Sequence, residues 1–177
     1  MPHSQKSHYP GPDGLRSSIL TDTPDDVPLL LFSLFNLSLK TYTFPDAWKC
    51  STFHPRHKSG PPNIISNYRP ICHISPVAKL LERIVNNALL AHLSSRSFFV
   101  AAQHGFLKRR STTTCQLAFM DLVTSSIDAG KQTALIYLDI KKAFDRVQHS
   151  LLLIKLQQAG VEDPLLSWFR SYLSDRT

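Results

Sequence analysis

Apolar residues recur three and four positions apart in two long stretches, which is the spacing of an amphipathic helix. The first predicted helix runs from about Val27 to Lys40, with Pro28 in its first turn. Its apolar positions are Val27, Leu30, Leu31, Leu34 and Leu37, with Phe35 as a further candidate. The second begins at Ser75 and Pro76, because serine caps helices well and proline fits the first helical position. Its broad apolar face predicts a core helix: Val77, Leu80, Leu81, Ile84, Val85, Ala88 and Leu89.

Three further helices are predicted downstream. The third is capped by Ser111 or Thr112 and ends at Gly130, a residue suited to the left-handed turn after a helix. The fourth runs over about 149–159, and the fifth opens at Pro164. In the fifth helix, Trp168 and Tyr172 are predicted as core aromatics rather than as platforms for stacking bases.

Strand signals are fewer. The sequence TALIYLDI, residues 133–140, is short, continuously apolar and rich in β-branched residues, which predicts a strand buried on both faces. The proline-rich stretch 41–70 indicates loops and short strands, with 52–60 as a hairpin arm. Residues 1–26 are polar and rich in Pro, Gly and Asp, which predicts an extended arm. Helices around few strands indicate an α+β fold.

The composition predicts an intracellular protein that binds polyanions. Twenty basic against 13 acidic residues give a net charge of +7 and a pI near 9.5. Such a charge favours nucleic acid, although ordinary solubility is the alternative. The N-terminus has no signal-peptide core, and the apolar run 29–39 is too short to span a bilayer. Three widely spaced cysteines indicate a reducing compartment, so we expect the cytoplasm, the nucleus or both.

Cysteine and histidine residues in the first half of the chain could be drawn as a zinc site. The candidates are Cys50, His54, His57, Cys72 and His73. Their spacing fits no common structural zinc pattern, so zinc is disfavoured.

The residues that follow the predicted strand carry the clearest chemical signal. Asp139 ends an apolar strand, where a charge is costly unless a cation or metal meets it. With Ala143 and Phe144 it resembles the first catalytic motif of reverse transcriptases, a strand followed by D-x-x-x-A-F/Y. The version in LINE-type (non-LTR) retrotransposons continues as A-F-D-x-V-x-H-x-x-L. This chain matches it at Ala143, Phe144, Asp145, Val147, His149 and Leu152.

The resemblance implies two-metal nucleotidyl transfer with Mg²⁺, or Mn²⁺ in its place. It implies that the Asp139 carboxylate, the catalytic residue, and the Ile140 carbonyl are metal ligands. Backbone N–H groups near Lys142 and Ala143 would cradle the triphosphate of a dNTP. Phe144 would lie under the sugar and exclude a ribose 2′-hydroxyl. The alternative is that Asp139 merely caps or ion-pairs at a strand end.

A second match covers Asn67-Tyr68-Arg69-Pro70-Ile71, preceded by Pro55-x-x-Lys58-x-Gly60. It resembles the fingers segment of the same family. The resemblance implies that Lys58 and Arg69 face the incoming triphosphate, a role that suits the planar fork of arginine. A solvated surface cation is the alternative for either residue.

A third match is Gln103-His104-Gly105-Phe106-Leu107, followed by Arg110-Ser111-Thr112. LINE-type enzymes usually carry Q-x-G-F-R and a basic loop here. Leu107 stands where that arginine is expected, which puts one nucleic-acid contact in doubt. Lys108, Arg109 and Arg110 are the implied nucleic-acid-binding cations, with solvated charges as the alternative.

Weaker matches at 11–14 and 168–176 extend the resemblance over nearly the whole chain. It implies a partial right-hand polymerase fold, with an arm over 1–26 and fingers and partial palm over 27–177. We expect an incomplete palm sheet, because no Y/F-x-D-D hairpin follows within the 177 residues. The implied partners are template RNA, DNA primer and dNTP, without a membrane.

The 177 residues alone are therefore expected to be inactive, with a possible protein partner or self-association through the palm surface. The alternative functions are a non-enzymatic transposon remnant that binds RNA or DNA, and a helical fragment that binds a protein partner.

Overall fold

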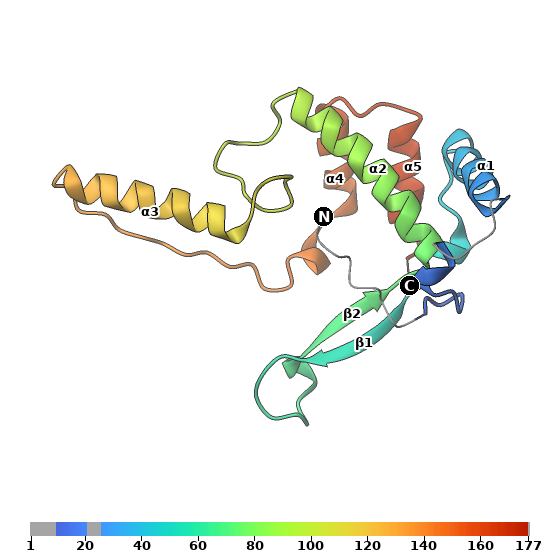
Figure 1. The fold of residues 1–177 in the computed structure, drawn as a ribbon, viewed down its shortest axis with the longest axis horizontal. Coiled ribbons are helices and arrows are strands. Elements are labelled where there is room, and N and C mark those ends of the chain that lie inside the picture. The colour runs from blue at the N-terminus through green and yellow to red at the C-terminus, as the bar shows by residue number, and fades with distance from the viewer. Residues whose placement is uncertain (1–9, 21–25, 177) are drawn as a thin grey trace. The chain divides into compact units, whose positions relative to one another are not determined.

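A computed structural model describes residues 10–20 and 26–176. It divides into two compact units, the first formed by residues 1–89 and 148–177 and the second by residues 90–147. The elements are α1 (Asp26–Lys40), β1 (Thr52–His57), β2 (Tyr68–His73), α2 (Pro76–Ser95), α3 (Thr112–Asp128), α4 (His149–Gln158) and α5 (Leu165–Leu173), with short 3-10 turns between them (Figure 1). The α+β class and all five predicted helices are thereby confirmed.

Helices α2 and α3 begin, and α3 ends, at the capping residues that the sequence predicts. The hydroxyl of Ser75 accepts a hydrogen bond from the Val77 N–H at 3.2 Å. Ser111 caps α3 and forms a reciprocal capping box with Thr114. Gly130 follows α3 with a φ of +67°, where glycine avoids the strain of a side chain.

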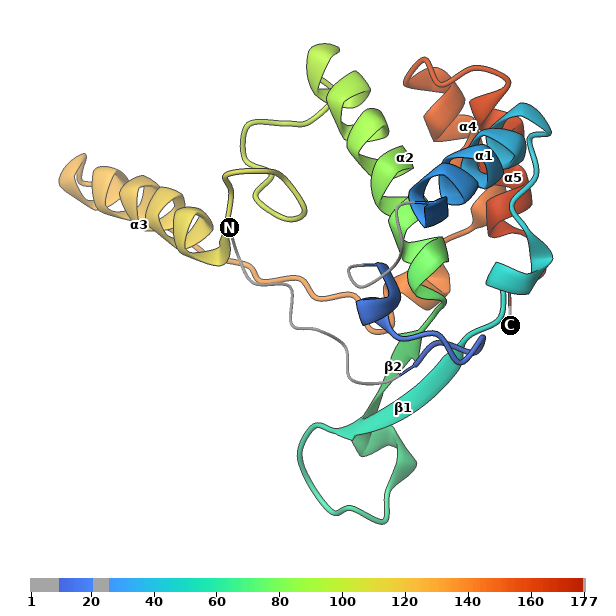
Figure 2. The same cartoon turned by 45° about the vertical axis from the view of Figure 1, so that its right-hand side comes forward.

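The core of the first unit lies where α2 meets α1 and α5 (Figures 1 and 2). Phe44, Leu81 and Trp168 are almost wholly buried there. The apolar face of α2 is narrower than its sequence predicts, since Ile84 remains 48% exposed. The prediction that Trp168 is a core residue is confirmed, and Tyr172 stacks on it with ring centroids 5.4 Å apart.

Helix α1 buries only part of the face that its sequence predicts. Leu30, Leu34 and Leu37 are 68%, 40% and 57% exposed, whereas Phe35 and Ser38 are buried. Burial of a serine is tolerated because its hydrogen bonds are satisfied. The Ser38 hydroxyl donates to the Thr43 carbonyl at 2.6 Å and accepts from the Trp168 indole N–H at 3.0 Å. Of the predicted positions, Phe35 is in the core and Leu31 packs against it, so hydrophobic spacing identified part of the buried face and missed Ser38.

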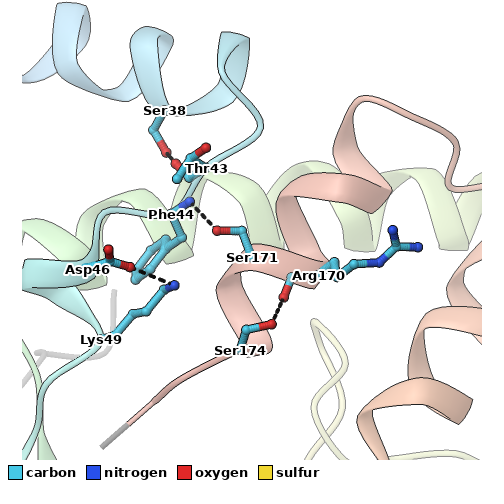
Figure 3. Close-up of polar contacts among 8 residues, drawn as sticks. All are labelled: Ser38, Thr43, Phe44, Asp46, Lys49, Arg170, Ser171 and Ser174. Atoms are coloured by element: carbon cyan, nitrogen blue, oxygen red, sulfur yellow. Dashed lines mark hydrogen bonds and ion pairs between the residues drawn. The ribbon is translucent and has the colours of Figure 1, made fainter.

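Polar contacts tie the segment after α1 to α5 (Figure 3). The Phe44 N–H donates to the Ser171 hydroxyl at 3.0 Å. Lys49 is largely buried and forms an ion pair of 2.9 Å with the exposed carboxylate of Asp46. The first contact joins this segment to α5, and the second is local to the turn that leads into β1.

A second tie joins α5 to α2. One carboxylate oxygen of Glu82 accepts from the Tyr172 hydroxyl at 2.9 Å and from the Arg176 guanidinium at 3.0 Å. That guanidinium also lies 4.2 Å from the centroid of the Tyr172 ring. Burial, and then the Glu82 carboxylate, raise the pKa of Tyr172, although Arg176 opposes this effect.

The prediction of a buried strand over 133–140 is wrong for this structure. The segment is extended but forms no strand, and Ile136, Tyr137 and Leu138 are at least 80% exposed. A central strand needs neighbours on both edges, and among the described residues the only ladder is β1 with β2. The segment instead runs back along α3 (Figure 1), where the rings of Tyr137 and Phe119 lie 6.2 Å apart.

The predicted arm over 1–26 falls partly outside the described residues, which omit 1–9 and 21–25. The described part is folded rather than extended: the Gly14 N–H bonds the Gly11 carbonyl at 3.0 Å in a turn, Ser17–Leu20 forms a 3-10 helix, and Leu15 and Leu20 pack against the core. A Cβ on Gly11 would lie 3.0 Å from the Ser75 Cα, so this turn packs closely on the start of α2. No helix in the described ranges has the length and apolarity needed to span a membrane.

Candidate functional site

The sequence-predicted site residues fall on three segments. Lys58 and Arg69 belong to the β1–β2 hairpin of the first unit, whereas the other candidates belong to the second unit. There they form two groups, the basic loop over 104–111 and the turn over 139–144.

The hairpin places two arginines side by side. The strands are antiparallel, and Arg56 is the direct cross-strand partner of Arg69. Direct partners project from the same face of the ladder, where like charges destabilise the pairing. Both side chains are exposed, so water screens part of this repulsion. An arrangement of this kind becomes favourable when an anion lies between the two guanidinium groups.

The loop that joins the strands is held by the first residues of the N-Y-R-P-I segment. The Asn67 side-chain amide donates to the Pro61 carbonyl at 2.9 Å, and the Tyr68 hydroxyl donates to the Pro62 carbonyl at 2.8 Å. The Lys58 N–H closes the loop on the Asn67 carbonyl at 2.8 Å. Asn67 and Tyr68 thus hold the loop that lies between the two predicted phosphate-binding residues, Lys58 and Arg69.

A histidine pair lies at the other end of the hairpin. The rings of His54 and His73 are 4.9 Å apart in an edge-to-face arrangement. Partial burial lowers the pKa of His73, and the nearby His54 and Lys79 lower that pKa further. His73 therefore stays neutral to a lower pH than an isolated histidine would.

The turn after the extended segment presents its backbone in a distinctive form. Lys142 has a φ of +53°, and Ala143 follows in the right-handed helical region with φ −54° and ψ −43°. Successive left- and right-handed residues point neighbouring N–H groups to one side, forming a nest for anions. Asp139, Ile140 and Phe144 flank this turn and are exposed, Phe144 to 81%.

The basic loop is ordered by a histidine that the family pattern leaves unspecified. His104 Nε2 lies 3.3 Å from Arg110 Nη1, and Nδ1 lies 2.9 Å from the Thr114 hydroxyl. Arginine can only donate, so Nε2 accepts and Nδ1 carries the proton in neutral His104. The Thr114 hydroxyl accepts from the Ser111 N–H at 2.8 Å and donates to the Ser111 carbonyl at 2.9 Å. His104 thus links Arg110 to the capping box of α3.

Two of these residues were not singled out by the sequence patterns. His104 occupies the variable position of Q-x-G-F-R, and its role depends on loop geometry that spacing does not reveal. Arg56 is adjacent to Pro55, and only the strand register shows that it opposes Arg69. The available signal in the sequence was that Arg56 and Arg69 lie equally far from the hairpin loop, on its two sides.

The predicted metal ligands are few. The Asp139 carboxylate and the Ile140 carbonyl are hard oxygen donors of the kind that Mg²⁺ prefers. Throughout the described residues there is no group of three or more His, Cys, Asp or Glu side chains placed to hold a metal ion. These donors fit one edge of a magnesium site and not a complete pair of sites.

Comparisons with known proteins identify the family. The family described as reverse transcriptase (RNA-dependent DNA polymerase) matches residues 56–177. The probable RNA-directed DNA polymerase from transposon BS of Drosophila melanogaster is 30% identical over 94% of the chain. The RNA-directed DNA polymerase from mobile element jockey of the same species is 29% identical over 95% of the chain. The chain spans 18% of the length of each of these relatives.

The match begins within the hairpin and continues through the basic loop and the turn after Asp139. It thereby includes all the residues proposed from the sequence to contact nucleotide or nucleic acid. The chain belongs to the reverse transcriptase (RNA-dependent DNA polymerase) family, in the group found in LINE-type retrotransposons.

Proposed function

We propose that this chain supplies the fingers and part of the palm of an RNA-directed DNA polymerase, over residues 27–177, with 1–26 as an arm. Its substrates are then a template RNA, a DNA primer and dNTPs. The observation that carries this proposal is the turn at 139–144. A catalytic-motif aspartate is followed there, within four residues, by a backbone nest formed at Lys142 and Ala143.

The nest and the hairpin serve the same ligand in this proposal. The N–H groups near Lys142 and Ala143 bind phosphate oxygens of the dNTP. Lys58 and Arg69 bind the triphosphate from the fingers, and the cross-strand Arg56 adds positive charge beside Arg69. An anion between the paired arginines removes the repulsion that the ladder otherwise bears. Phe144 packs under the deoxyribose and leaves no room for a 2′-hydroxyl.

Magnesium, or manganese, would be held at one edge by the Asp139 carboxylate and the Ile140 carbonyl. The metal pair supplies activation of the primer hydroxyl and stabilisation of the leaving pyrophosphate when bound. The chain's own residues position the triphosphate and the sugar. With a single carboxylate in the donor set, the 177 residues by themselves would not fix both ions.

A salt titration tests the nucleic-acid part of this proposal. Labelled single-stranded RNA is titrated with the chain at about 50 and 200 mM salt. We expect affinity to fall steeply between the two, because Lys and Arg side chains release counterions from the phosphates. Absent binding, or binding indifferent to salt, contradicts the proposal. DNA of the same length serves as the comparison for strand preference.

A binding-only function is the second candidate. It is favoured by the donor set of one carboxylate and one carbonyl, which suffices for contact with phosphates but not for nucleotidyl transfer. In that case the same basic groups bind RNA or DNA without catalysis, or the exposed apolar segment 133–140 binds a protein partner. Primer extension separates this candidate from the polymerase, because only the polymerase lengthens a primer.

A further inference from the structure

A pocket of about 410 Å³ opens in the second unit between the last turns of α2 and the basic loop. Its apolar wall comes from Leu90, Phe99 and Leu107, which are half-buried. Lys108 and Arg110 also line it and are exposed. The pocket therefore combines an apolar wall with two positive charges, and Leu90 and Phe99 have no part in the site proposed above.

The lining narrows the chemistry of a ligand. A wholly apolar ligand would desolvate the two cations without pairing them, which is unfavourable. A bare polyanion would use the cations and leave the apolar wall in water. A nucleobase joined to a sugar phosphate satisfies both parts, since its face stacks on aromatic or apolar side chains while its phosphate meets Lys or Arg. The volume is within the range of small-ligand pockets.

The backbone around the pocket is held in an unusual conformation. Ser97, Phe106 and Arg109 have φ values of +51°, +62° and +61°, which residues other than glycine rarely adopt. Arg110 is anchored by donating to the Ala101 carbonyl at 2.5 Å and by its contact with His104. Local strain that persists is maintained by surrounding contacts and is common at ligand sites. Of the residues that line the pocket, Arg110 is thus held in place by its own contacts.

We propose that this pocket binds one unpaired base of a single-stranded RNA, stacked against Phe99 and Leu107, with its phosphate on Lys108 and Arg110. The inference rests on the proposed RNA-binding function and adds a base-dependent component to it. The base is held by its face, so the pocket accepts bases without reading their sequence. Phosphate contact alone predicts no preference for a strand with bases over one without them.

The test compares two strands of equal charge. One is an oligo(U) of about 12 nucleotides, and the other is the matching abasic ribose-phosphate strand. Fluorescence anisotropy gives the affinity of each for the chain at two salt concentrations. Stacking is worth about 1–3 kcal/mol per base, so we expect oligo(U) to bind at least about fivefold more tightly. The advantage should persist as salt rises, because stacking releases no counterions.

Two variants locate the effect. Phe99→Ala should remove most of the advantage of oligo(U) and leave the affinity for the abasic strand unchanged. Leu107→Arg places a cation on the apolar wall, so it should raise the affinity for the abasic strand and reduce the advantage. Phe32→Ala is the matched control, because Phe32 is an exposed phenylalanine of α1 in the first unit. Circular dichroism establishes that each variant is folded, and Leu107→Arg provides the deciding comparison if Phe99→Ala does not fold.

The outcomes separate the two proposals. Salt-dependent binding of both strands with no advantage for oligo(U) overturns the pocket and leaves RNA binding intact. The pocket is likewise overturned when folded Phe99→Ala or Leu107→Arg keeps the full advantage, or when Phe32→Ala loses it equally. Absence of binding to either strand overturns the proposed function and this inference together. An advantage lost only in the pocket variants supports the base-binding site.

Discussion

At the scale of single residues, the most informative position is Arg69, because it faces another arginine across a two-stranded ladder. Two positive charges placed opposite each other lower the stability of the hairpin in the absence of a ligand. Relief by bound phosphate gives a binding contribution that grows with the charge of the ligand. A triphosphate has more to gain from it than one phosphate of an RNA backbone, which is already one contact among many.

Arg69→Gln should therefore weaken dNTP binding more than RNA binding. We expect a loss of about fivefold for dTTP, equivalent to about 1 kcal/mol at an exposed site. The loss for RNA should be smaller, because other cations share the contact. Separate titrations of labelled dTTP and of labelled RNA with the chain measure both. Lys155→Gln in α4 is a control for the loss of one charge. Equal losses for both ligands would make Arg69 a general phosphate contact.

Tyr172 gives a prediction about stability and pH. Burial and Glu82 raise the pKa of Tyr172 above the usual value of about 10. A raised pKa in the folded state means that its contribution is complete below pH 10 and is lost as pH rises through the folded pKa. Tyr172→Phe should remove this decline and cost about 1 kcal/mol from the lost hydrogen bond to Glu82.

Urea unfolding at pH 7 and at pH 10 and above measures this effect. Tyr137→Phe is the matched control, since Tyr137 is 80% exposed. It should change neither the free energy of unfolding at pH 7 nor its decline at high pH. An alkaline decline that is the same in Tyr172→Phe and in the unmodified chain would assign the decline to other groups.

At the scale of elements, α3 depends on its cap more than the other helices do. Leu117, Met120 and Ile127 are 65%, 53% and 61% exposed, so little burial stabilises the helix. A helix without tertiary support is marginal in water. The capping box of Ser111 and Thr114 and the link through His104 to Arg110 then determine both the start of α3 and the shape of the basic loop.

Ser111→Ala should weaken α3 locally. Loss of a serine cap costs about 1 kcal/mol, which is large for a helix with few buried contacts. Amide hydrogen exchange should accelerate several-fold in 112–120 and leave α2 and α5 unchanged. Thr113→Ala, inside the helix beyond the cap, should leave the exchange rates close to those of the unmodified chain. Uniform acceleration in all helices would show instead that α3 contributes to global stability.

The success of the helix predictions has a local cause. Caps, prolines and glycines act on the adjacent turn, so Ser75, Ser111 and Gly130 could be interpreted from the sequence alone. The strand over 133–140 could not, because strand formation needs partners elsewhere in the chain. The buried face of α1 was predicted only in part, since Ser38 is buried through hydrogen bonds, which hydrophobic spacing does not record. The roles proposed for Asp139, Lys58 and the other site residues remain predictions.

At the scale of the 177 residues, the metal donors proposed within the described part are too few to hold two ions. A single carboxylate at Asp139 holds Mg²⁺ weakly, because this ion dehydrates reluctantly. Without a second source of carboxylates, two ions are not fixed on either side of the reacting phosphorus, and in-line geometry is lost. The net charge of +7 does not depend on a metal site, so RNA binding should persist where catalysis is absent.

The 177-residue chain should therefore show no template-directed DNA synthesis. The measurement is primer extension on poly(A) with an oligo(dT) primer, dTTP and either Mg²⁺ or Mn²⁺. Asp139→Asn is the control for contaminating polymerases, because it keeps the size of the side chain and removes its charge. Extension that disappears in Asp139→Asn would show that copies of this chain complete the site together.

The extended segment 133–140 has a consequence for how the chain is cut. A protease needs several residues of extended, accessible backbone, and this segment offers them, with Lys131 before it and Lys141 and Lys142 after it. Brief trypsin treatment should cleave there first, before sites inside α2 or α5, and mass spectrometry should detect fragments ending or beginning at these lysines. A strand or partner that paired with the segment would slow this cleavage. The rate of tryptic cleavage is therefore a direct assay for any strand or partner that pairs with the segment.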